Sequence, residues 1–222
     1  IYDSALQTTS IQTKSIPVLI NYTRNGKRYE KVPDIRDFDL IKRIDEFKVP
    51  YWFPVARMPI GDESRRNDRT GITNVHNFYT KRNLLINAAI HHYAIKSKFP
   101  FQILLLKTSY DLTHSTKMTR IIFKDGSKPI LTGYQSGTLY ISSLPVEKNV
   151  INGNLDKLTE FCKAFSLLNK QQITSVGSAH QTNINDNSID YIFTDPPFGS
   201  NLMYSELNFL WESWLKLRTN IE

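Results

Sequence analysis

The chain has 222 residues, of which 40% are hydrophobic and 22% charged, and its formal net charge is +7. These are values of an ordinary globular protein, and no apolar run reaches the roughly 18 residues that a membrane helix needs, so we expect no membrane partner. Its single cysteine, Cys162, has no second cysteine to pair with, which favours a reducing, cytoplasmic compartment.

The first fifty residues predict a hairpin followed by a helix. Asn25-Gly26 lies between Val18–Tyr22 and Lys27–Val32, and because both turn residues tolerate positive φ, a β-hairpin is expected. Apolar residues at helical spacing predict a helix over Asp37–Phe47. Three prolines predict an extended, irregular stretch over Val49–Ile60.

The middle of the chain predicts a loop, two helices and a strand pair. The polar, glycine-bounded segment Gly61–Gly71 is typical of a mobile surface loop. A helix is expected over Thr80–Ser97 with Thr80 as its N-cap, and another over Phe99–Thr116. Arg120–Lys124 and Thr138–Ser142 are the expected strands.

The last third alternates helix, strand, strand and helix, which is typical of an α/β sheet. Apolar stripes predict helices over Leu155–Asn169 and Met203–Leu217. A short strand is expected at Ile173–Ser178. The run Ile189–Thr194 is compact and apolar, like a buried parallel strand.

The positive charge is concentrated in one region. Tyr51–Arg120 contains 11 Lys+Arg against 4 Asp+Glu, and the remainder of the chain is neutral. This excess indicates a polyanionic partner, with nucleic acid the first candidate, or else a solvated positive face. The best candidates for phosphate contacts lie on the polar loop and at a helix start, and they are Arg65, Arg66, Arg69, Lys81 and Arg82.

One motif suggests a specific chemistry. The predicted strand Ile189–Thr194 is followed directly by Asp195, Pro196, Pro197, Phe198 and Gly199. Proline fixes φ and has no amide donor, and it holds the preceding residue extended. A carboxylate, a free carbonyl and an aromatic ring are therefore kept in fixed relation. Such a corner suits an exocyclic amine of a nucleobase, because the carboxylate can accept one N–H and the carbonyl the other. The alternative is a structural diproline turn with a solvated Asp195.

This segment resembles the S-adenosylmethionine-dependent DNA amino-methyltransferases, whose hallmark is Asp/Asn/Ser-Pro-Pro-Tyr/Phe/Trp after a sheet strand. The resemblance implies that Asp195 binds the target amino group, that the Pro196 carbonyl takes its second hydrogen, and that Phe198 stacks on a base flipped out of duplex DNA. The resemblance also implies that Asp195 forms part of the cofactor-binding site. In this family an aspartate in the first position of the motif favours adenine N6 over cytosine N4 as the methylated amine. Looser similarity covers Tyr204–Glu206, His76–Leu85 and Gly137–Val150.

The sequence departs from this family in one respect. The family binds its cofactor with a glycine-rich loop, and no Gly-x-Gly occurs in the 222 residues. We therefore expect a fragment whose cofactor loop lies before Ile1 or after Glu222, and which by itself binds S-adenosylmethionine weakly and is inert. The expected fold class is α/β, with a partial Rossmann-like methyltransferase sheet over residues 151–222. An α+β insertion over residues 1–150 would precede it and could face DNA.

Other functions remain open on the sequence alone. The chain could be a non-catalytic nucleic-acid-binding module, or an amino-methyltransferase acting on RNA or protein. The pair His91-His92 is not expected to bind metal, because adjacent helical residues point about 100° apart. Cys162 is expected to pack in the core. Trp211 and Trp214 are also expected to pack in the core, where their stripe should cover the sheet.

Overall fold

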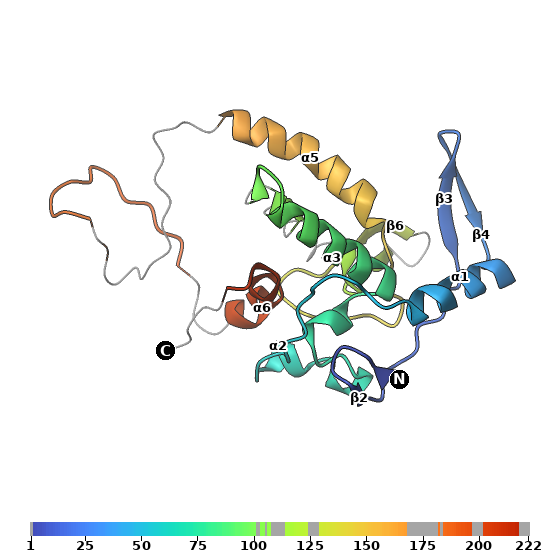
Figure 1. The fold of residues 1–222 in the computed structure, drawn as a ribbon. Coiled ribbons are helices and arrows are strands. Elements are labelled where there is room, and N and C mark those ends of the chain that lie inside the picture. The colour runs from blue at the N-terminus through green and yellow to red at the C-terminus, as the bar shows by residue number, and fades with distance from the viewer. Residues whose placement is uncertain are drawn as a thin grey trace.

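The computed structural model describes residues 2–100, 103–104, 106–107, 114–123, 129–167, 182, 184–196 and 202–217. Within these residues the protein combines helices with short antiparallel strand pairs (Figure 1). At this coarse level the mixture of helix and strand agrees with the predicted class. None of the described helices is both long enough and apolar enough to cross a membrane.

The described strands form separate two-stranded antiparallel sheets. They pair Tyr2–Asp3 (β1) with Thr8–Thr9 (β2), Ile20–Arg24 (β3) with Lys27–Lys31 (β4), and Arg120–Phe123 (β5) with Pro129–Gly133 (β6). The predicted hairpin at Asn25-Gly26 is confirmed. No parallel pair occurs in the described part of the chain.

The described helices include the main ones that the sequence predicts. They are Ile35–Glu46 (α1), Asp62–Arg65 (α2), Asp68–Thr70 (η1), Val75–Phe78 (η2), Lys81–Ile95 (α3), Val150–Leu167 (α5) and Tyr204–Leu215 (α6). Thr80 caps α3 as predicted, because its hydroxyl accepts from the Asn83 amide at 3.3 Å. Asp34 caps α1 by accepting from the amides of Arg36 and Asp37. Each cap satisfies amides that a helix start leaves without partners.

The core is built from segments far apart in the sequence. Its fully buried members are Met58, Ile72, Val75, Phe78, Tyr79, Leu84, Ala88, Met118, Leu139, Leu210 and Trp214. The last two come from α6, and the indole N–H of Trp214 donates to the Tyr79 hydroxyl at 2.9 Å. Helix α6 is thus fixed on the 49–88 region. The prediction that Trp214 packs in the core is confirmed, but its ring neighbours are Trp52, Tyr79 and His91 and not the predicted sheet.

Two predictions about local packing are wrong. Thr138–Ser142 is not a strand, because side chains of the 61–71 segment occupy the backbone groups of Leu139; β5 pairs with β6 instead. Cys162 is exposed, as is much of the apolar stripe of α5, including Leu155 and Leu158. No element in the described ranges covers that stripe. The predicted strand Ile173–Ser178 and much of the predicted helix Phe99–Thr116 lie outside the described residues.

Candidate functional site

The diproline motif lies on an exposed segment. Asp195 and Pro196 are exposed and belong to no helix or strand, and Pro197 and Phe198 lie outside the described residues. The stretch 184–196, orange in Figure 1, stands away from the body of the protein. No described residue donates a hydrogen bond to the Asp195 carboxylate, and both Asp195 and Pro196 are exposed to solvent.

The residues before the motif do not form the predicted buried strand. Ile192 and Phe193 are 74% and 80% exposed, and Ile189–Thr194 has no strand partner among the described residues. An apolar run of this kind is buried when neighbouring strands and helices cover both of its faces. The described strands pair elsewhere, so the prediction of a buried strand is wrong for this structure.

The helix that follows the motif is firmly held. Helix α6 buries Leu210 and Trp214, and the Lys107 ammonium lies 3.6 Å from the centre of the Trp214 ring. Glu206, in the first turn of α6, is only 5% exposed. A carboxylate buried to this extent needs hydrogen-bond donors around it.

A hydrogen-bond donor to the Glu206 carboxylate comes from the polar segment 61–71. The backbone N–H of Ser64 donates to Oε2 of Glu206 at 2.6 Å. Gly61 begins the same turn and has an extended backbone, and a Cβ placed there would overlap the Glu206 carboxylate. The absence of a side chain at Gly61 is therefore what lets α6 approach α2. Sequence reasoning missed this contact; its only signals were the acid in the first turn of α6 and the glycine before α2.

A second anchor holds the other side of the segment. Glu63 accepts from the Leu139 amide at 2.9 Å, from the Thr138 hydroxyl, and from Arg66. Partial burial would raise the pKa of the Glu63 carboxyl, but these hydrogen bonds lower it below its ordinary value. Asn67 completes the anchor by donating to the Leu139 carbonyl at 2.8 Å. The segment that the sequence predicts as a mobile loop is instead short helical turns pinned on two sides.

The five cations predicted to contact phosphate fall into two groups. Arg65, Arg66 and Arg69 share the 61–71 segment, whereas Lys81 and Arg82 begin α3.

Their surroundings differ. Arg66 pairs with Glu63, Arg82 Nε lies 2.7 Å from Glu147, and Arg65 lies 3.7 Å from Asp68. The other two, Arg69 and Lys81, form no ion pair within the part of the chain that the structure describes. An incoming phosphate would compete with an ion-paired acid at the first three positions. At Lys81 it would meet the charge of Asp45, which acts on the ammonium without an ion pair, and Arg69 has no ion-pair partner among the described residues.

A buried histidine lies beside α6. His91 is 4% exposed, and its ring packs 4.9 Å from that of Trp52 and 5.8 Å from that of Trp214. Burial first, and then the charges of Lys107 and Lys216, lower the pKa of His91 to about 4. The imidazole is therefore neutral at neutral pH. In the described ranges no group of three His, Cys, Asp or Glu gathers as metal ligands would.

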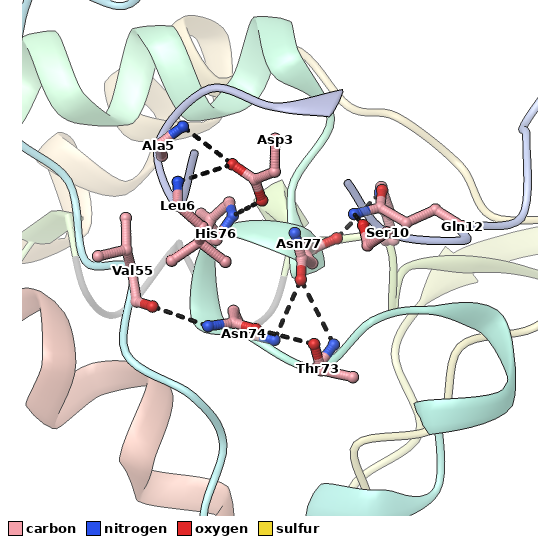
Figure 2. A network of polar contacts seen from close by, with 11 residues as sticks. Asp3, Ala5, Leu6, Ser10, Gln12, Val55, Thr73, Asn74, His76 and Asn77 are labelled. Carbon is pink, nitrogen blue, oxygen red and sulfur yellow. Dashed lines mark hydrogen bonds and ion pairs between the residues drawn. The ribbon is translucent and has the colours of Figure 1, made fainter. Parts of the chain in front are cut away.

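A polar network connects the N-terminal segment to the turn before α3 (Figure 2). His76 Nε2 lies 2.7 Å from Asp3 Oδ2, and the Asp3 carboxylate also accepts from the amides of Ala5 and Leu6. Burial lowers the pKa of His76 despite the neighbouring carboxylate. Its other ring nitrogen has no hydrogen-bond partner in the described part of the chain.

One hollow in the described surface is apolar. It has a volume of about 790 Å³ and lies over the outer face of α3, between Phe47 and Ile151. Neither the Asp195 segment nor the 61–71 segment contributes to its lining. The hollow therefore belongs to neither candidate site.

The residues present do not fit a full S-adenosylmethionine site. The glycines that are described serve other purposes, as at the hairpin turn of Gly26 and the close approach at Gly61. No two glycines of the sequence are separated by a single residue, so the turn that lets backbone approach a nucleoside is missing. In comparisons with known proteins, no family model, curated protein or solved structure matches the chain.

Proposed function

We propose that this chain carries the amine-binding motif of a DNA amino-methyltransferase that acts on adenine N6 in duplex DNA. The observation that supports the proposal best is the accessibility of the motif's two acceptors. The Asp195 carboxylate and the Pro196 carbonyl lie on an exposed, extended segment, and no described group occupies the carboxylate. Two adjacent acceptors of this kind match the two N–H donors of an exocyclic amine.

These residues would hold and activate the amine. The carboxylate of Asp195 accepts one N–H and the carbonyl of Pro196 accepts the other, so the nitrogen is drawn out of the base plane and its lone pair is freed from the ring. Phe198 stacks on the base after it has left the duplex, which costs a few kcal/mol. The methyl donor implied by the family is S-adenosylmethionine, whose glycine-rich cradle is not among the residues of this chain.

The arginines of the turn beside α6 support DNA as the partner. Arg65, Arg66 and Arg69 sit on a segment that Glu206 fixes to α6, the helix that begins nine residues after Asp195. Cations fixed to the same structural unit as the helix after the motif are well placed to bind a phosphate backbone. A partial Rossmann-like sheet over residues 151–222 is part of this proposal.

A non-catalytic nucleic-acid-binding module is the second candidate. The observation that favours it is that the exposed run Ile189–Thr194 has no strand partner among the described residues, whereas the methyltransferase motif normally follows a sheet strand. In that case Asp195 would be solvated and dispensable.

The two candidates separate on one substitution. Asp195→Ala is made in the protein as its gene encodes it, with Asp190→Ala as the control, because Asp190 is an exposed acid on the same segment. The methyltransferase proposal expects methyl transfer to duplex DNA to fall at least a hundredfold in Asp195→Ala, with DNA binding kept. Unchanged transfer in that variant contradicts it.

A further inference from the structure

The hairpin β3–β4 projects from the body of the protein as a two-stranded ribbon (Figure 1). Its register places Arg24 opposite Lys27 and Thr23 opposite Arg28. The turn residues Asn25-Gly26 have φ values of 51° and 74°, a turn whose twist matches that of the strands. Every strand residue of the ribbon is exposed except Ile20 and Lys31 at its base, so both faces of the ribbon are open to solvent.

An aromatic pair stiffens the ribbon. The rings of Tyr22 and Tyr29 stack across the two strands with centroids 5.5 Å apart, and each residue is 42% exposed. Cross-strand aromatic pairs of this kind stabilise a hairpin. The pair joins the two strands at the middle of the ribbon, between its base and its charged tip.

The charges of the ribbon are arranged with the free cations at its tip. At its base, the Lys31 ammonium lies 2.7 Å from Asp37 and 3.3 Å from Asp34. These contacts neutralise the lysine and fix the ribbon to the start of α1. Near the turn, no acid in the described part of the chain lies within ion-pair distance of three exposed cations, which are Arg24, Lys27 and Arg28.

We propose that the β3–β4 ribbon is a DNA-reading arm whose tip enters the major groove of duplex DNA. The major groove admits a two-stranded β-ribbon, and the three tip cations would meet phosphates and base edges there. An isolated two-stranded hairpin is marginally stable in water, so a partner that orders this one is expected. The choice of DNA as the polyanion rests on the proposed function; the exposed ribbon and its charge do not.

The test removes the tip charges and measures DNA binding. The full chain is titrated into a fluorescent 30-base-pair duplex at 50 and 200 mM salt, and anisotropy is recorded. The ribbon variant is Arg24→Gln, Lys27→Gln, Arg28→Gln. The matched control replaces three exposed lysines elsewhere by glutamine, at Lys14, Lys48 and Lys163, which lie outside the ribbon and outside the basic region Tyr51–Arg120. Circular dichroism and thermal melts establish that both variants fold.

The ribbon variant is expected to bind at least about tenfold more weakly at 50 mM salt, with a salt slope lower by about 0.9 for each phosphate that the ribbon no longer neutralises. The control substitutions are expected to change the affinity and the salt slope far less. Equal effects in the two variants, or no binding of the duplex by the unmodified chain, overturns the proposal.

A methyl-transfer assay of the same variants distinguishes a failure of this proposal from a failure of the proposed function. Ribbon-dependent binding together with an absence of Asp195-dependent transfer supports the arm and contradicts the enzyme. Asp195-dependent transfer that is unaffected by the ribbon variant supports the enzyme and contradicts the arm.

Discussion

The backbone N–H of Ser64 donates to the Glu206 carboxylate at 2.6 Å, across 142 residues of sequence. This hydrogen bond joins the arginine-bearing segment to α6. It is shielded from water, because Ser64 is fully buried and Glu206 is 5% exposed. The contact therefore sets where three of the candidate DNA-binding cations lie relative to the helix after the diproline motif.

Loss of the Glu206 carboxylate should destabilise the fold. Glu206→Ala leaves the buried Ser64 amide without an acceptor, and hydrogen bonds to a charged group contribute about 1.5–3 kcal/mol. We expect the free energy of unfolding, measured by urea denaturation, to fall by that amount. Glu160→Ala is the control, since Glu160 forms an exposed pair with Lys157 on α5, and such pairs contribute about 0.2–1 kcal/mol. Equal losses in the two variants would contradict the assignment.

Gly61 and Glu206 should behave as a coupled pair. Gly61→Ala adds a methyl group where the carboxylate lies, and overpacking of this kind costs about 1–3 kcal/mol. In the Glu206→Ala background the same substitution meets no carboxylate, so its cost should fall by at least about 0.5 kcal/mol in a double-mutant cycle. Additive effects would show that the cost at Gly61 has another source.

Acid should weaken the fold through His91. The unfolded chain takes up a proton near the ordinary histidine value of 6.5, whereas the folded protein does so only near a pKa of about 4. Stability is therefore present above pH 6.5 and is lost as the pH falls toward 4, by up to about 3 kcal/mol. We expect His91→Phe to reduce the slope of the unfolding free energy over this range, leaving the part due to His76 and His114, whose pKa values burial also lowers. His92→Phe should leave the slope unchanged. An equal slope in His91→Phe and the unmodified protein would rule out His91 as the cause.

The arginines of the 61–71 segment should differ in their effect on DNA. Arg69 has no acid partner among the described residues, whereas Arg66 is bound to Glu63. Arg69→Gln should thus lower duplex affinity and reduce the salt slope by about 0.9, with stability unchanged. Arg66→Gln should affect stability more and affinity less. Anisotropy titrations and melts of both variants test this ordering, and the reverse ordering would contradict it.

Local signals in the sequence predicted much of the fold. The Asn25-Gly26 turn predicts the β3–β4 hairpin, Thr80 the start of α3, and the apolar spacing α1, α5 and α6. Each of these signals acts over a few residues, because a hairpin turn or a helix cap forms its hydrogen bonds between residues close in the sequence.

Contacts between distant segments could not be predicted in this way. The pairing of β5 with β6 instead of Thr138–Ser142 depends on Glu63 and Asn67 binding the backbone of Leu139. Likewise Ile189–Thr194 has the composition of a buried strand, but composition does not say whether a neighbouring strand is available. For the candidate site, the sequence predicts the residues of the motif and the arginines of the 61–71 segment. It leaves out Glu206, which ties that segment to α6.

The most direct test of the central claim is the nucleoside content of duplex DNA after incubation with the protein, as its gene encodes it, and S-adenosylmethionine. Digestion and mass spectrometry should find N6-methyladenine with the unmodified protein and with Asp190→Ala, and none above background with Asp195→Ala. The same amount of methylated base with Asp195→Ala, or no methylated base with any of the three, would contradict the account.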